Sequence, residues 1–276
     1  MKKNRCEECL NHMKIIITAG GTTEKIDPVR KLANTATGRL GSLTAEEFVR
    51  QAGDRAEKIY YVCEPGAAVP ELECLERVTV HGAQGAGEAL SKLLRTEKID
   101  AAVHSMAVSD YTAAGLTTAE NLAGYLAGRL FPLSGHSFAD EGALAGFLAG
   151  CIRENDRLLD RDAKVGSNYP DLILNMKQTP KLIGLFKALQ PSAVLVGFKL
   201  LSGVETPLLL EAGREVLEKN SCDFVLANDL SEIGGGRHAG YLISSDRSCV
   251  RLETKAEIAR EIVRSVLLRI EEEART

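Results

Sequence analysis

The stretch Lys14-Ile-Ile-Ile-Thr-Ala-Gly-Gly21 decides the fold. Its β-branched apolar residues end in a glycine pair, which is the pattern of a buried parallel strand that meets a loop. A polar stretch follows as far as Thr37, and residues 38–52 then carry apolar side chains at helical spacing until Gly53 ends the helix. A strand, a loop and a helix in this order predict the first unit of an α/β sheet.

The same alternation continues along most of the chain. Thr179 and Pro180 suit the N-cap and the first position of a later helix. The predicted fold class is therefore α/β, a Rossmann-like, mostly parallel sheet with helices on both faces and a β-hairpin near the C-terminus. We expect further strands at 58–63, 77–80, 101–104, 172–174, 193–196 and 224–227, helices at 86–94, 179–189, 207–219 and 254–272, and the hairpin at 241–244 and 249–252.

The middle of the chain departs from this alternation. Leu-Ala-Gly repeats around a break at Pro132 and Gly135 predict a helical insert at 115–162, and a flap follows at 163–170. We expect residues 13–276 to form a single domain. The charged residues 1–12 read as a disordered leader, with Met13 as an alternative start.

Composition excludes several classes of protein. The 276 residues carry a net charge of −4, whereas a protein that binds nucleic acid usually shows a positive surplus. The longest uncharged runs, 142–152 and 188–198, are far shorter than the roughly 20 residues that a membrane-spanning helix needs. Seven cysteines, an odd number, favour reduced thiols and a cytoplasmic location. Cys6 and Cys9 lack the second ligand pair of a zinc site.

In sheets of this kind, ligands bind beyond the carboxyl ends of the strands. Three polar or glycine-rich motifs are expected at such ends, namely residues 20–22, 109–111 and 227–229. The glycine pair can bring backbone N–H groups close to phosphate oxygens, or it can simply make a tight turn. The dinucleotide fingerprint and the Walker A motif are absent, because Gly38 and Gly41 follow only after a long loop.

The residues from Lys14 to Arg30 and from Leu32 to Gly41 resemble the phosphopantothenate–cysteine ligase family, also called phosphopantothenoylcysteine synthetase, in its stand-alone bacterial form. The resemblance covers almost the whole chain from Met13. It continues in the same order through Ala107–Tyr111, Lys177–Lys181, Val196–Lys199 and Ala227–Asp229.

The resemblance implies a ligase of coenzyme A biosynthesis in the cytoplasm. It would join 4′-phosphopantothenate and L-cysteine with CTP through an acyl-cytidylate intermediate, and it would release CMP and pyrophosphate. It further implies Mg²⁺ with the CTP, no flavin, and a homodimer.

The family's functional residues map onto two candidate catalytic positions. Asn34 would donate its amide N–H to the developing oxyanion, although a turn Asn that caps the helix near Gly38 is the alternative. Lys164, on the flap, would neutralise charge at the α-phosphate, although a solvated surface lysine is the alternative. The nucleotide-binding residues would be Gly20, Gly21, Thr22, Asp110, Lys177, Gln178, Thr179, Pro180, Phe198 and Lys219, with Asp110 also the metal ligand.

Two positions depart from the family pattern, and a few other residues have a structural interpretation. Thr35-Ala36 and Gly166-Ser167 replace residues that are usual in the family. His104 is expected to be a hydrogen-bonded core histidine, and Asn228 to fix a loop. Two further functions stay open: an NAD(P)-dependent Rossmann-like reductase, and a non-catalytic nucleotide-binding sensor.

Overall fold

The computed structural model describes residues 12–135 and 137–275, so the predicted leader lies outside the described residues apart from His12. The chain divides into two compact units. Unit 1 takes its described residues from Met1–Thr23, Ala33–Ser109 and Pro180–Thr276, and unit 2 consists of Glu24–Leu32 and Asp110–Thr179. The predicted insert and flap both lie in unit 2, while the expected single domain of residues 13–276 stays a prediction.

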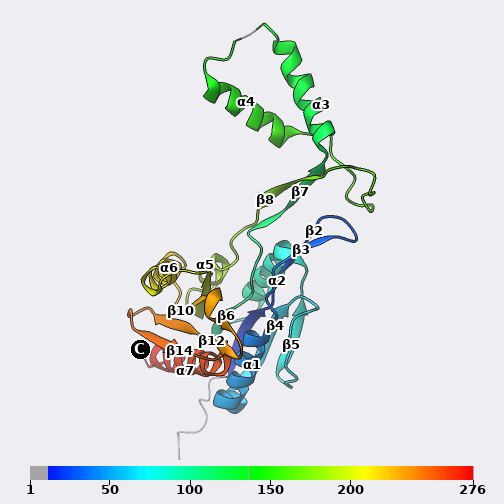
Figure 1. Ribbon diagram of the computed structural model, residues 1–276. Coiled ribbons are helices and arrows are strands. Elements are labelled where there is room, and N and C mark those ends of the chain that lie inside the picture. Colours follow the sequence, from blue (N-terminus) through cyan, green and yellow to red (C-terminus); the bar gives the residue numbers. More distant parts are fainter. Residues whose placement is uncertain (1–11, 136, 276) are drawn as a thin grey trace, which may run out of the picture. The chain divides into compact units, whose positions relative to one another are not determined.

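Unit 1 is built on an eight-stranded sheet with the order β14-β13-β10-β9-β6-β1-β4-β5. Six of its strands are parallel, and the C-terminal hairpin adds the last two in antiparallel fashion. The predicted α/β sheet with its hairpin is confirmed (Figure 1). The strands are β1 (Met13–Ala19), β4 (Ala56–Cys63), β5 (Leu75–Thr79), β6 (Ala101–His104), β9 (Val194–Leu201), β10 (Phe224–Asp229), β13 (Gly240–Ser244) and β14 (Cys249–Leu252).

The parallel strands, numbered along the chain, lie in the order 3-2-1-4-5-6, which is the dinucleotide-fold order. Strand order therefore reverses between β1 and β6, and Ile17 of β1 pairs with Val103 of β6 at this point. In open α/β sheets the crevice beyond the strand ends at such a switch point is where ligands bind.

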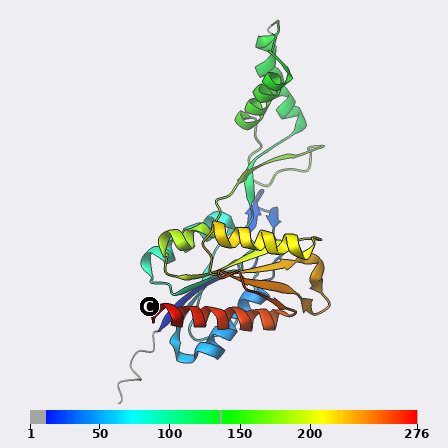
Figure 2. The same cartoon turned by 90° about the vertical axis from the view of Figure 1, so that its left-hand side faces the viewer.

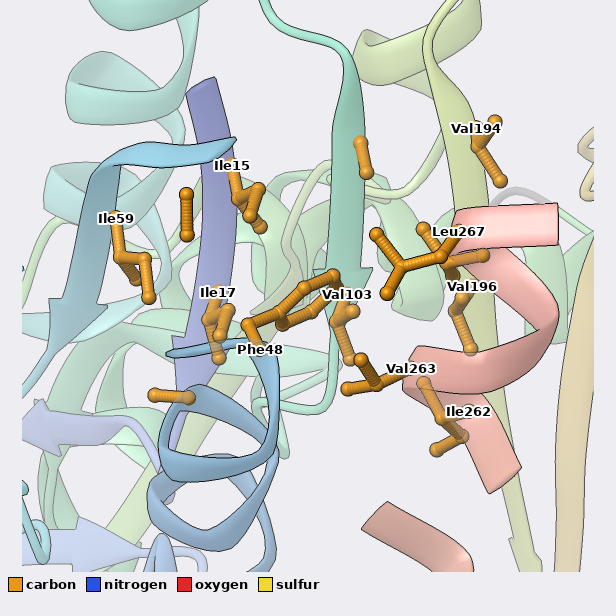
Figure 3. Close-up of a cluster of buried hydrophobic side chains, with 14 of the residues drawn as sticks. Ile15, Ile17, Phe48, Ile59, Val103, Val194, Val196, Ile262, Val263 and Leu267 are labelled. Carbon is orange, nitrogen blue, oxygen red and sulfur yellow. The ribbon is translucent and has the colours of Figure 1, made fainter. Parts of the chain in front are cut away.

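Helices cover both faces of the sheet. Alternate side chains of β1 point to opposite faces, and because they are apolar on both, each face is buried under helices. Ile15 and Ile17 pack with α1 and α7 on one face, as Figure 3 shows, and Ile16 packs with α2, α5 and α6 on the other. Figure 2 shows α7 and α6 on the two sides of the sheet. The helices are α1 (Arg39–Ala52), α2 (Gly82–Thr96), α5 (Gly184–Leu189), α6 (Thr206–Lys219) and α7 (Lys255–Glu273), with short turns η1 (Gly53–Arg55) and η3 (Leu230–Glu232) and the small pair β11 (Ile233–Gly234) and β12 (Arg237–His238).

Unit 2 contains the antiparallel pair β7 (Tyr111–Thr117) and β8 (Ile173–Gln178) and most of the pair β2 (Thr23–Lys25) and β3 (Lys31–Ala33). Between β7 and β8 the chain forms a helical hairpin of α3 (Ala119–Leu130), η2 (Phe131–Leu133) and α4 (Glu141–Glu154). No residue of α3 is buried, and in α4 only Cys151 is. The Thr117 hydroxyl donates to Arg157 O at 2.7 Å, so the hairpin begins and ends at neighbouring points (Figure 1).

One predicted helix start is wrong. The helix expected from Thr179 and Pro180 begins at Gly184, with Ile183 as its N-cap. The reason is strand pairing: β8 runs to Gln178 and Thr179 N still donates to Asp110 O at 3.0 Å, which keeps the chain extended. The long-range pairing of β8 with β7 therefore overrides the local N-cap pattern at Thr179 and Pro180.

Candidate functional site

The ends of β1 and β6 are joined by backbone hydrogen bonds beyond the strands themselves. Ala107 N donates to Gly20 O at 2.8 Å, and Thr22 N donates to Ala107 O at 3.1 Å. The Thr22 hydroxyl oxygen accepts from Ser109 N at 2.8 Å. The two loops at the switch point therefore form one hydrogen-bonded platform, and the predicted residues Gly20, Gly21 and Thr22 lie on it.

The glycine pair has a steric cause in the platform. Gly20 has a φ of 81°, in the left-handed region that side chains disfavour. A Cβ on Gly21 would lie 2.1 Å from Asn34 O, a backbone atom. The pair thus lets the backbone at Asn34, directly after β3, pass close to the end of β1.

Asn34 is fixed to this platform through both its backbone and its side chain. Its backbone N donates to Thr22 O at 3.1 Å, and its side-chain Nδ2 donates to Ala107 O at 2.8 Å. The alternative interpretation, an Asn that caps the next helix, is wrong, because α1 has Gly38 as its N-cap and no side-chain hydrogen bond there. The side chain is exposed, and its Nδ2 carries a second hydrogen that the bond to Ala107 does not use.

The N-terminus of α1 lies at the same edge of the sheet as the glycine pair. A Cβ on Gly38 would lie 3.3 Å from Gly20 N, so the helix begins beside the end of β1. The Tyr61 hydroxyl donates to Ala68 O at 2.8 Å, and burial raises the pKa of Tyr61 above its ordinary value. Backbone N–H groups at the start of such a helix favour anions.

Glu64, which sequence reasoning missed, follows β4 and holds the loop after β1 and the start of α2 together by hydrogen bonds. Its buried carboxylate accepts from Thr23 N and from the Thr23 hydroxyl, both at 2.6 Å, and from Gly82 N at the start of α2 at 2.9 Å. The available signal was its position, because an acidic residue follows directly after the predicted strand at 58–63.

Asp229, which the sequence analysis placed at a strand end without a role of its own, plays a similar part at the end of β10. Its carboxylate accepts from Gly203 N at 2.9 Å, Val204 N at 2.8 Å and Ser231 N at 2.7 Å. The Ser231 hydroxyl and these N–H groups lower the pKa of Asp229 below its ordinary value. The carboxylate thus ties the loop after β9 to the loop after β10.

His104 is a core residue, as predicted. Its Nδ1 lies 2.9 Å from the Thr18 hydroxyl oxygen, and its ring contacts Phe186 at a centroid distance of 5.4 Å. Burial lowers the pKa of His104 to about 4. Asn228, predicted to fix a loop, is buried, with its Nδ2 3.5 Å from His238 Nε2.

Three other predicted residues of unit 1 belong to segments of the chain outside the two loops that form the platform. Phe198 is half-buried in β9 and packs against the core on the α1 and α7 face. Pro180 is exposed in the turn before α5. Lys219 is the last residue of α6, which leads into the start of β10, so it lies at the opposite edge of the parallel sheet from Gly20.

Four predicted residues meet at one end of the β7 and β8 pair in unit 2. Thr112 pairs with Lys177 and Tyr111 with Gln178, and Thr179 N donates to Asp110 O. The side chains of Lys177 and Gln178 are exposed, as is Asp110. Lys164 is exposed in the segment between α4 and β8, next to the buried Val165.

Comparison with protein families gives a match over residues 10–120 and 159–269 to the family described as "DNA/pantothenate metabolism flavoprotein C-terminal domain". This chain belongs to that family. The unmatched residues 121–158 are those of the helical hairpin. The family segments thus contain the platform, β7, β8 and the segment with Lys164.

Relatives of known name share this region. The coenzyme A biosynthesis bifunctional protein CoaBC of Thermococcus kodakarensis is 27% identical over 255 residues, which cover 92% of this chain and 50% of that protein. The CoaBC protein of Methanocaldococcus jannaschii is 26% identical over 92% of this chain and 50% of that protein. This chain therefore spans about half the length of the curated relatives it matches.

Solved structures agree with the fold. The DNA/pantothenate metabolism flavoprotein from Streptococcus pneumoniae is 28% identical with a TM-score of 0.73, covering 93% of this chain and 99% of that one. A Cab2 variant in complex with phosphopantothenate-cysteine has a TM-score of 0.65 at 16% identity, and the match covers 96% of this chain and 90% of that one. At this identity the similarity establishes the fold only. Across residues 12–135 and 137–275, no helix has the length and apolar character needed to span a membrane.

Proposed function

We propose that this protein joins 4′-phosphopantothenate to L-cysteine at the expense of CTP. The phosphopantothenate carboxylate attacks the α-phosphate of CTP, which forms an acyl-cytidylate and releases pyrophosphate. The cysteine amine then attacks the activated carbonyl, loses a proton, and displaces CMP. Support comes from membership in the family, from the CoaBC relatives, and from the fold neighbour that holds phosphopantothenate-cysteine.

The observation that carries the proposal is the way Asn34 is held at the switch point. Its amide is fixed by a 2.8 Å bond to Ala107 O, and one N–H and the amide oxygen remain for a ligand. A neutral donor held in place before the reaction stabilises an oxyanion without a competing protonation step. We assign that role to Asn34 in the step where cysteine attacks the acyl carbonyl.

The nucleotide's phosphates would be held by groups that favour negative charge. The backbone N–H groups at the start of α1 and the platform of Gly20, Gly21 and Thr22 lie at the same edge of unit 1. We also assign Lys164 to the α-phosphate and Lys177 to Thr179 to the nucleotide.

Mg²⁺ would be held by one carboxylate of the protein together with the triphosphate. No cluster of three or more His, Cys, Asp or Glu suited to a metal occurs in the described part of the chain. A cage made only of protein ligands is therefore absent from those residues, whereas Mg²⁺ commonly takes one or two carboxylates beside substrate phosphates. Asp110 fits that requirement, and the ion would neutralise phosphate charge during the first step.

The structure argues against a dinucleotide reductase. In such enzymes the acidic residue after the second strand binds the ribose, but here that residue, Glu64, already accepts three internal hydrogen bonds. The loop between β1 and α1 also runs through β2 and β3 instead of joining the strand directly to the helix. A non-catalytic sensor would bind CTP without turnover.

The deciding experiment measures CMP and AMP release with Mg²⁺, 4′-phosphopantothenate and either CTP or ATP, with and without cysteine. CMP release that needs both phosphopantothenate and cysteine supports the proposal. AMP release instead would overturn the nucleotide assignment, and no release from folded protein would favour the sensor.

The variant Asn34→Ala tests the residue assignment. It should keep CTP binding and pyrophosphate release while amide formation falls by about 100-fold or more. Asn155→Ala is the matched control, since Asn155 also makes one side-chain hydrogen bond to the backbone, at 3.1 Å, at the end of α4. Normal amide formation by Asn34→Ala would refute the role of Asn34.

A further inference from the structure

The segment that carries Lys164 is anchored on both sides. Arg161 donates Nε to Ile26 O at 2.8 Å, Nη2 to Lys25 O at 2.7 Å and Nη1 to Ala113 O at 3.0 Å. One guanidinium thus binds the chain just before the flap to the end of β2, to the loop that follows β2 and to β7. These contacts all lie within unit 2.

The second anchor is Val165, the residue directly after Lys164. Its backbone O accepts from Arg30 Nη2 at 2.5 Å, and its backbone N donates to Asp27 Oδ2 at 3.4 Å. Val165 is buried, whereas Lys164 and Gly166 beside it are exposed. The backbone at Lys164 is therefore held three residues before and one residue after it, while its side chain remains in solvent.

Asp27 is the centre of the second anchor. It is 2% exposed, its Oδ1 accepts from Val29 N at 2.9 Å and Arg30 N at 2.8 Å, and its Oδ2 lies 3.0 Å from Arg30 Nε. Burial alone would raise the pKa of Asp27, but these N–H groups, the Arg30 charge and the Val165 N–H outweigh it and hold the pKa below its ordinary value. The Asp27 carboxylate stabilises the turn at Val29 and Arg30 through their N–H groups. Its ion pair also orients the Arg30 guanidinium, which donates to Val165 O.

The same loop leads directly to the other proposed catalytic group. Residues 24–32 follow the glycine pair and precede Asn34 by a single residue in the chain. Nothing in the activation chemistry assigned above uses the Asp27 carboxylate or the Arg161 guanidinium. Their contacts instead decide where the backbone that carries Lys164 can be.

We propose that Asp27, with Arg30 and Arg161, is a positioning element that fixes the flap backbone so that Lys164 reaches the nucleotide by side-chain motion alone. The inference rests on the proposed function, because it assigns Lys164 to the α-phosphate. A lysine on an unanchored flap would have to be ordered in each turnover, and misplacement by about 1 Å can cost about 100-fold in rate.

A double-mutant cycle on pyrophosphate release tests the inference. Asp27→Asn should slow phosphopantothenate-dependent pyrophosphate release by about 10- to 100-fold with little change in the KM for cysteine. In a Lys164→Ala background the same substitution should have no further effect, because a residue that acts through Lys164 has nothing left to position. Additive losses in the two backgrounds, or an unchanged rate in Asp27→Asn, would overturn the inference.

Hydrogen exchange provides a readout that does not depend on ligase activity. The Val165 amide should exchange faster in Asp27→Asn than in the wild type, and unchanged exchange would refute the anchor even if the chain proves not to be a ligase. Arg161→Lys, which loses the three-carbonyl fork, is the second variant if Asp27→Asn does not fold. Asp171→Asn is the matched control, because the Asp171 carboxylate accepts from Ala119 N at 2.7 Å elsewhere in unit 2.

Discussion

Acid should destabilise this protein through one histidine at the switch point. His104 ends β6, and burial lowers its pKa to about 4 from an ordinary 6.5. In the unfolded chain His104 therefore becomes protonated below pH 6.5, whereas in the folded chain it stays neutral down to about pH 4. Folding stability contributed by the neutral imidazole is complete above pH 6.5 and is lost as the pH falls through this window.

The size of the effect follows from the difference in pKa. About 2.5 units correspond to about 3 kcal/mol across the whole window, of which about 2 kcal/mol has been lost by pH 5. Urea unfolding at pH 8 and pH 5 measures it. Because carboxylates also titrate, the comparison is with His104→Asn, whose amide lies near the position of Nδ1 and keeps a partner for Thr18.

The variant should be less stable than the wild type at pH 8, because it loses the ring contact with Phe186. Its additional loss between pH 8 and pH 5 should be smaller than that of the wild type by about 2 kcal/mol. His81→Asn, at an exposed histidine, is the control for removing one imidazole. Equal losses in the wild type and His104→Asn would refute the assignment of a buried, neutral His104.

Three further predictions concern the loops and the hairpin. Gly21→Ala should cost about 1–3 kcal/mol in urea unfolding and abolish CMP release, since its Cβ would meet Asn34 O, whereas Gly66→Ala, with nothing within 4 Å, should behave as wild type. Glu64→Gln should cost about 1–3 kcal/mol in the same assay, because an amide cannot accept from all three donors. A chain with residues 120–156 replaced by a short Gly-Ser turn should keep CMP release and nearly the same melting temperature in calorimetry, and loss of folding would contradict this.

Most of the fold could be predicted because the local spacing of apolar residues indicates where its strands and helices lie. The apolar run at Ile15–Ile17 and the helix that Gly53 ends match β1 and α1 to within about two residues. The start of α5 could not be predicted, since pairing with β7 extends the chain through Thr179, and no local pattern reports a partner strand some sixty residues away.

The candidate site shows the same difference between residues that a local sequence pattern predicts and residues whose contacts depend on distant parts of the chain. Gly20, Thr22 and Asn34 belong to the one stretch of sequence, residues 14–41, that carries the family resemblance, and the structure brings them together at the switch point. Glu64 accepts from donors distant in sequence, and Asp27 adds the distant Val165 to its local partners, so their residue types alone do not reveal these contacts. Lys219 stays a prediction as a nucleotide-binding residue, and its helix ends at the opposite edge of the sheet from Gly20.

The hairpin of α3 and α4 makes the chain tolerant of changes in length. Leu159 N donates to Leu116 O at 2.7 Å, so the chain returns from the hairpin beside the point where it left β7. Loop-closure entropy grows only with the logarithm of loop length, and each doubling costs about 0.6 kcal/mol. A folded guest whose own termini lie close together, such as a fluorescent reporter, should therefore fit between residues 118 and 157 while β7 and β8 keep their register. The helical hairpin, which the family model does not match, is therefore the natural place to attach a probe to this protein.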